Sequence, residues 1–67
     1  MSVAKVIELV AESETSFDDA VQQGLAIASE TIRGITGADV ISMSCEVDGD
    51  RITMYRTTVN IAFAVER

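Results

Sequence analysis

The densest group of potential metal ligands in the sequence is acidic and lies near its start. Its members are Glu12, Glu14, Asp18 and Asp19. Carboxylate oxygens bind hard cations such as calcium, but acids in the first turn of a helix also stabilise the helix dipole. Because residues 16–19 read as the start of a helix, we prefer the second explanation and predict no metal site.

A second acidic segment, Asp48-Gly49-Asp50, lies in the middle of the sequence. Calcium loops of the EF-hand type distribute their ligands over about twelve residues, so this segment is too short to be one. An Asp-Gly pair between alternating segments is typical of a tight β-hairpin. We therefore predict a hairpin turn here.

Residues for nucleophilic or redox catalysis are scarce. The sequence has one cysteine, Cys45, and no histidine, which excludes an internal disulfide and the usual ligands of a structural zinc. Cys45 alternates with other apolar residues, so we predict that it packs on a buried apolar face. There is no nucleophile–base pair and no glycine-rich phosphate loop. Only paired carboxylates remain for acid–base chemistry, and we expect that the chain is not an enzyme.

The charge balance argues against nucleic-acid and membrane partners. Eleven acidic residues against five basic ones give a net charge of −6, which repels phosphate backbones and anionic lipid surfaces. The basic residues are scattered, and the sequence has no apolar run long enough to span a bilayer and no signal-peptide pattern. A soluble, cytoplasmic protein is expected, and the single unpaired cysteine agrees with a reducing compartment.

The first half of the sequence predicts a strand followed by a helix. Residues 3–11 are rich in β-branched residues and alternate in part. Residues 17–33 repeat apolar residues at intervals of three and four, with Ser16 as the N-cap, Asp19 in the capping-box position, Arg33 in the last turn and Gly34 as the C′ residue. The stripe comprises Phe17, Ala20, Val21, Gly24, Leu25, Ala28 and Ile32. Its small members, Gly24 and Ala28, would let the helix approach the sheet closely.

The second half predicts two strands joined by the hairpin. Residues 39–48 alternate strictly between apolar and polar side chains, which indicates a half-buried strand. Residues 51–65 form an unusually long third strand, with Tyr55 as a core or interface aromatic. A helical crossover followed by a hairpin favours a three-stranded antiparallel sheet with the third strand between the other two and the helix on one face. The predicted fold is a single α+β domain, βαββ, over residues 1–67.

A chain of this size cannot bury enough apolar surface by itself. At 67 residues it hides only about 60% of the surface that its unfolded form exposes, yet 48% of its residues are hydrophobic. Without disulfides or a structural metal, small domains gain stability by association. The long third strand also extends beyond what one helix covers. We therefore predict a homo-oligomer, with any ligand site between subunits.

Several segments together resemble the dodecin family of small flavin-binding proteins, over essentially the whole chain. They are Lys5-Val6-Ile7-Glu8-Leu9-Val10, Ser13, Ser16-Phe17, Thr31-Ile32-Arg33, Ala38-Asp39-Val40 and Tyr55-Arg56-Thr57-Thr58-Val59-Asn60-Ile61-Ala62-Phe63. The resemblance implies a hollow homododecamer of cubic symmetry that binds flavins, typically in pairs near two-fold axes, and stores or sequesters them. It also implies a binding protein instead of an enzyme.

The sequence departs from the dodecin pattern at both flavin-contacting positions. Gly37 stands where the family has a tryptophan that stacks on the flavin ring, and Arg56 stands where it has a glutamine that bonds the ring. With Ala38 these are the candidate ligand-binding residues, for FMN or riboflavin, and we expect weakened or lost flavin binding because a stacking ring contributes about 1 kcal/mol beyond area burial. The guanidinium of Arg56 could stack on a ligand ring or pair with a phosphate or a flavin oxygen, but a pair with a carboxylate at a subunit contact is the simpler expectation. The alternative function is a structural shell that binds metal ions or another ligand such as coenzyme A.

Overall fold

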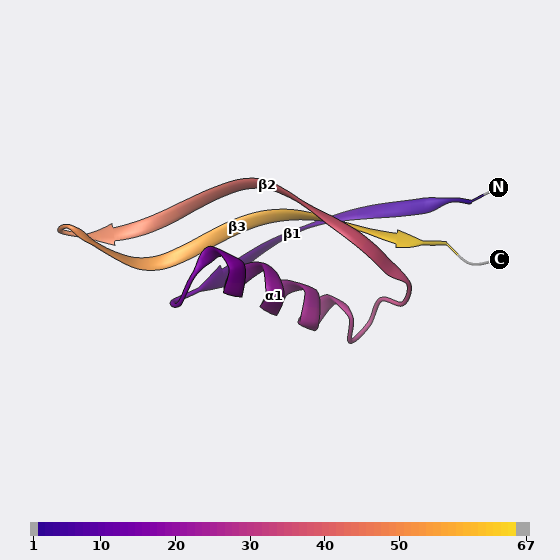
Figure 1. The fold of residues 1–67 in the computed structure, drawn as a ribbon, viewed down its shortest axis with the longest axis horizontal. Helices are drawn as coiled ribbons and strands as arrows, with labels where there is room; N and C mark the ends of the chain where they lie inside the picture. The colour runs from indigo at the N-terminus through magenta and orange to yellow at the C-terminus, as the bar shows by residue number, and fades with distance from the viewer. Residues whose placement is uncertain (1, 66–67) are drawn as a thin grey trace.

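A computed structural model describes residues 2–65 and has the predicted βαββ order (Figure 1). Strand β1 spans Ala4–Ser13, helix α1 Phe17–Ala28, strand β2 Ile35–Asp48 and strand β3 Arg51–Ala64. The strands form one antiparallel sheet in the order β1-β3-β2. The prediction of an α+β fold with β3 in the centre is confirmed.

The link between β1 and α1 is held by a small network of side-chain hydrogen bonds. The Ser16 side chain accepts a hydrogen bond from the Asp19 backbone N–H at 3.0 Å, which confirms Ser16 as the N-cap. The expected capping box is incomplete, because the Asp19 carboxylate accepts instead from the Ser13 hydroxyl at 2.6 Å and from Gln23 at 2.6 Å. Ser13 is buried and also accepts from the Thr15 backbone N–H. It fixes the turn that places α1 against the sheet.

Helix α1 is shorter than the sequence predicts. It ends at Ala28 with Ser29 as C-cap, and Thr31 N–H bonds to the Ala28 carbonyl in the following turn. Arg33 is therefore not in the last helical turn, as predicted, but beyond the helix. Gly34 has a positive φ of 77°, which fits its predicted role in reversing the chain, although it serves the turn into β2 and not a helix C′ position.

Strand β2 begins at Ile35, earlier than the predicted start at residue 39, because Ile35 already pairs with Phe63 of β3. Its pairing shifts register in three places, including the stretch between Val40 and Ser42. Ile41 is the extra residue at that bulge, so the strict alternation expected for this strand is interrupted there. Beyond the bulge, Met43 and Cys45 lie opposite Thr57 and Tyr55.

The core of one chain is thin and lies between α1 and the two strands it contacts, β1 and β3. It is built on Ala28, Val59 and Ile61. Half-buried hydrophobic residues surround them: Ile7, Leu9, Val21, Leu25, Ile32 and Ile35. Phe17 and Tyr55, both half buried, pack edge to face with ring centroids 5.0 Å apart. The molecule is long and flat, with extents of 51 × 20 × 12 Å.

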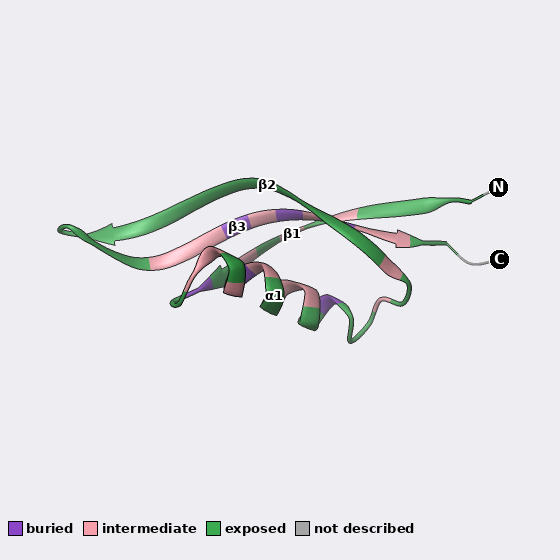
Figure 2. Cartoon of the chain, in the orientation of Figure 1, coloured by how far each residue is buried: buried purple, intermediate pink, exposed green. Residues whose placement is uncertain are grey.

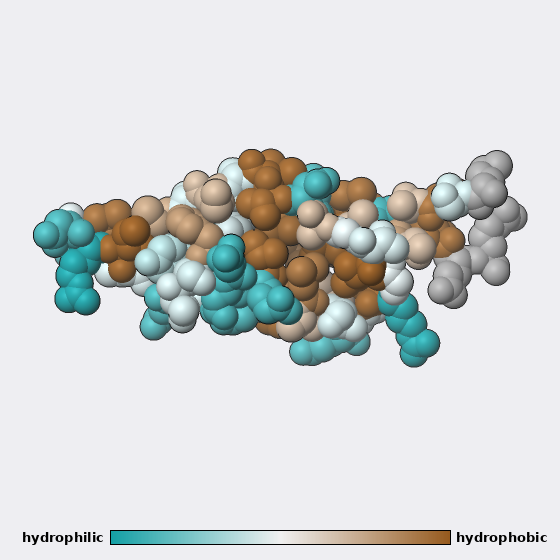
Figure 3. Space-filling model, viewed as in Figure 1, coloured by the Kyte–Doolittle hydropathy of each residue, from teal (hydrophilic) through white to brown (hydrophobic). Residues whose placement is uncertain are grey.

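The prediction that β2 is half buried is wrong for a single chain. After Ile35 every residue of β2 is exposed (Figure 2), because α1 packs on β1 and β3 and leaves the apolar residues of β2 uncovered. Its large hydrophobic side chains expose roughly half of their surface: Val40 47%, Ile41 53%, Met43 61% and Val47 58%. Hydrophobic residues accordingly cross the middle of the face shown in Figure 3. Cys45, predicted to be buried, is exposed for the same reason.

The described residues contain no helix that is both long and apolar enough to cross a membrane.

Gly24 provides the close approach between α1 and β1 that the sequence predicts. A Cβ at this position would lie 3.1 Å from the Cβ of Ala11. Replacing Gly24 with Leu should therefore push the helix off β1 and lower the free energy of unfolding by about 1–3 kcal/mol, measured by chemical denaturation. Gln22→Leu, at an exposed position of the same helix, is the control, and an equal loss in both variants would contradict close packing at Gly24.

Candidate functional site

The two faces of the sheet differ in chemistry. On β3, Thr57, Val59 and Ile61 are buried beneath α1, so the alternating residues Arg56, Thr58, Asn60 and Ala62 point to the opposite face, which no helix of the described residues covers. We call this the open face. On this open face, each of these β3 residues pairs with one residue of β2 and one of β1, which gives rows of three residues across the sheet. In the order β2, β3, β1 the rows are Gly37–Ala62–Val6, Asp39–Asn60–Glu8, Ser42–Thr58–Val10 and Ser44–Arg56–Glu12.

Arg56 lies in the centre of the open face, between two glutamates from the outer strands. Its Nε and Nη2 donate to the same oxygen of Glu12 at 2.8 and 2.6 Å, and Nη2 also donates to Glu46. The hydrogen bonds with Glu12, then those with Glu46, raise the pKa of Arg56 above its ordinary value. The three side chains remain partly exposed. Within one chain, the carboxylate partners of Arg56 are therefore Glu12 and Glu46.

The other two candidate residues are distant from Arg56 within one chain. Gly37 pairs with Ala62, which is six positions along β3 from Arg56, or about 20 Å of strand. Gly37 lies inside β2 instead of before it, and a Cβ added there would meet no atom within 4 Å. Ala38 pairs with Ile61 and so belongs to the helix side of the sheet. One chain does not bring the three residues together.

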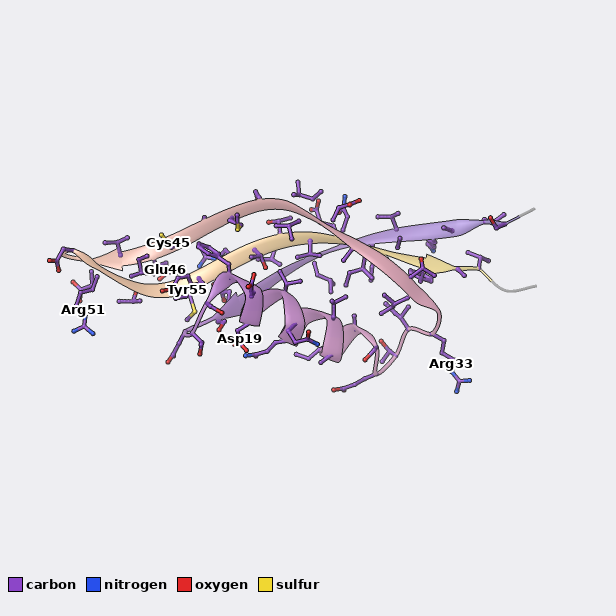
Figure 4. All side chains as sticks on the ribbon, in the orientation of Figure 1. Asp19, Arg33, Cys45, Glu46, Arg51 and Tyr55 are labelled. Carbon is purple, nitrogen blue, oxygen red and sulfur yellow. The ribbon has the colours of Figure 1, made fainter. Side chains whose placement is uncertain are left out.

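The remaining acidic residues form no metal site in the described part of the chain. No group of three or more His, Cys, Asp or Glu residues there is arranged to hold an ion. Asp19 is engaged by Ser13 and Gln23. Figure 4 shows Asp19 on the helix, with Glu46, Cys45 and Tyr55 on the part of the sheet nearer the hairpin and Arg33 at the other end. From the sequence, Ser13 is named only in the family resemblance and is assigned no structural role, although its three-residue spacing from Ser16 is a signal for the turn that it forms.

Two of the hollows on the surface of residues 2–65 are well formed, and neither contains Gly37, Ala38 or Arg56. The first, of about 250 Å³, runs between β1 and α1 beside Val10, Gly24 and Ile27, with Glu12 at its edge. The second, of about 480 Å³, is polar and lies beside Glu14 and Arg51 near the hairpin. A ligand site that uses Gly37 and Arg56 together would need surfaces from more than one chain.

Comparisons with known proteins give a consistent picture. The model of the Dodecin family matches residues 3–66. Among solved structures, an arginine-to-alanine mutant of the dodecin of T. thermophilus is 27% identical with a TM-score of 0.94, and each chain covers 100% of the other. The dodecin of Streptomyces coelicolor is 21% identical with a TM-score of 0.92, covering 98% of this chain and 94% of its own, which shows the fold alone.

A third solved structure bears on ligands. The calcium dodecin of Mycobacterium tuberculosis, described as a calcium-chelating antigen with a novel calcium-binding site, is 30% identical with a TM-score of 0.82, and the match covers 97% of this chain and 93% of that one. A search of curated proteins found no match.

The ion pairs of Arg56 give a salt-dependent prediction. Replacing Arg56 with Gln should lower the thermal unfolding midpoint in low salt, because Glu12 and Glu46 then lack a counter-charge. The difference from wild type should shrink in about 1 M sodium chloride, where the screening length falls to about 3 Å. Arg51→Gln is the matched control, since Arg51 forms no ion pair with the described residues. If the unfolding midpoint of Arg56→Gln lies as far below that of wild type in high salt as in low salt, this account is contradicted.

Proposed function

This chain belongs to the dodecin family, and we propose that it forms a homododecamer that binds and stores a small molecule between its subunits. The family and the fold identify a small-molecule-binding, oligomeric type of protein. The observation that carries the proposal is the exposed apolar surface of β2, which one chain does not cover. Catalysis is not part of the proposed function.

Energetics support the assembly. The buried hydrophobic residues of one chain are Ala20, Ala28, Val59 and Ile61. Burying apolar surface stabilises by about 25 cal/mol per Å², and the large hydrophobic side chains of β2 leave roughly half of their surface in water. Monomeric proteins rarely leave large hydrophobic residues side by side in this way. Contact with sister chains would bury them and would make stability depend on assembly.

The separation of the candidate residues supports a ligand site between subunits. Gly37 and Arg56 lie on the same open face but about 20 Å apart along the strand, so one ring-sized ligand would contact Gly37 of one copy and Arg56 of another. The ligand class that the family relationship favours is a flavin, FMN or riboflavin. Its affinity is weakened here because Gly37 supplies no stacking ring, and Ala38, which faces the helix side, contributes only backbone.

The alternative is a structural shell that binds metal ions or coenzyme A. A related dodecin is described as calcium-chelating, and twelve chains of charge −6 would carry −72 (12 × −6), which concentrates cations. Within residues 2–65 of one chain no cluster holds a metal, so such a site would also draw ligands from two copies. A cytoplasmic location is part of the proposal, supported by the free thiol of Cys45.

Assembly is testable by native mass spectrometry. At 7.2 kDa per chain, a dodecamer has a mass of about 86 kDa (12 × 7.2 kDa). Replacing Met43 with Glu should shift the protein to smaller species, because a charge would then be buried in the contact that covers β2. Thr31→Glu, in the exposed turn after α1, introduces the same charge and should still assemble. A monomeric wild type at micromolar concentration would refute the proposed assembly.

Flavin binding is testable by quenching of riboflavin fluorescence. Wild type should quench weakly, and Gly37→Trp should tighten binding by about fivefold or more, since one stacking ring is worth about 1 kcal/mol or more. The space at Gly37 is open to a side chain. Gly37→Leu, which adds apolar surface without a flat ring, is the control.

A Gly37→Trp oligomer that binds riboflavin no better than Gly37→Leu would contradict a flavin-type site at this position. A colourless wild-type oligomer that leaves riboflavin unaffected, together with calcium or coenzyme A binding by calorimetry, would favour the shell.

A further inference from the structure

We propose that Glu12 and Glu46 make the ligand site at Arg56 selective for uncharged, carbonyl-bearing rings and against phosphate-bearing ones. This inference rests on the proposed function and specifies its ligand class. An arginine on a binding surface is ordinarily a recognition group for phosphate. The surroundings of Arg56 in this chain reverse that expectation.

The hydrogen bonds of Arg56 leave little of its charge for an anion. Nε and Nη2, the edge of the guanidinium suited to bidentate pairing, are both occupied by the carboxylates. A phosphate could use this edge only by displacing Glu12, whose oxygen accepts two of these bonds. The exchange would leave two glutamates without a partner beside an incoming anion.

The cluster of Arg56, Glu12 and Glu46 carries a net negative charge. Arg56 contributes +1 and the two glutamates −2, so the cluster carries a net −1, and Glu8 and Asp39 add further negative charge two rows along the same face. The phosphate of FMN carries roughly −1.5 to −2 at neutral pH. Because the three side chains are partly exposed, the repulsion between the cluster and the phosphate acts through solvent and is screened by salt.

Arg56 still offers donors for an uncharged ligand. Its Nη1 forms no hydrogen bond with any residue in 2–65, and the two glutamates hold the guanidinium plane in place. A fixed N–H donor suits the carbonyl oxygens of a ring such as the pyrimidine part of a flavin. The arginine thus acts at this site as an oriented donor whose charge is already balanced.

The test compares riboflavin with FMN, which share a ring and differ by the phosphate. Dissociation constants are measured by fluorescence quenching at low salt in the Gly37→Trp background, where binding is expected to be strong enough to compare ligands. The Gly37→Trp parent should bind riboflavin more tightly than FMN, by about fivefold or more. Adding Glu46→Gln brings the cluster to neutrality and should reduce this ratio, and Glu12→Gln with Glu46→Gln leaves Arg56 unpaired and should favour FMN.

Glu30→Gln is the matched control, because it removes the same charge from the exposed turn after α1, away from Arg56; its ratio should equal that of the parent. Native mass spectrometry verifies that each variant assembles, and the single variants Glu12→Gln and Glu46→Gln give the same comparison if the double variant does not fold. High salt should move the parent ratio toward one.

If the ratio of the FMN and riboflavin dissociation constants is the same in all variants, with both flavins still bound, the charge selectivity is overturned and the proposed function remains intact. A ratio that changes as much with Glu30→Gln as with Glu46→Gln would also overturn it, since overall charge would then be the cause. Absence of binding of either flavin to the assembled Gly37→Trp protein would overturn the proposed site itself and the inference with it.

Discussion

Incomplete coverage of the sheet by its helix is the constraint on which this structure depends. Helix α1 has 12 residues and packs on β1 and β3, whereas β2 and β3 each extend over 14. No other element of residues 2–65 covers the apolar residues of β2. Hydrophobic surface that one chain leaves in water is the driving force for association, so the size of the helix relative to the sheet links the fold to the oligomeric nature of the family.

Strand β3 contributes to both faces of the sheet because its side chains alternate between them. Val59 and Ile61 supply the core beneath α1, while Arg56 and Asn60 belong to the open face. A substitution on one face leaves the other largely unaffected. This separation is consistent with dodecins that share 21–30% of their residues with this chain and keep TM-scores of 0.82–0.94.

The group formed by Glu12, Arg56 and Glu46 links all three strands at one level of the sheet. Exposed ion pairs contribute little to stability, so their main effect concerns geometry and charge. They hold the guanidinium of Arg56 between the two outer strands and offset its charge. In a chain of net charge −6, the one cation at the centre of the open face is thus not a free positive site.

Local sequence patterns correctly predict the order of elements, the N-cap at Ser16, the hairpin at Gly49, the central position of β3 and the dodecin family. These features follow from local patterns and short-range chemistry, because capping, turns and alternation involve residues close in sequence. The predicted end of the helix at residue 33 and the predicted start of the second strand at residue 39 are wrong, because α1 ends at Ala28 and β2 begins at Ile35. Pairing of Ile35 with Phe63 outweighs the helical periodicity, which continues to Ile32 in the sequence.

Which surfaces meet is visible only in the folded chain. The exposure of Cys45 depends on where α1 lies across the sheet, and the partners of Arg56 depend on strand register, which joins Glu12 to a residue 44 positions away. The same register separates Gly37 from Arg56. Contacts between residues distant in sequence are set by packing and pairing of whole elements, and a pattern of neighbouring residues does not encode them directly.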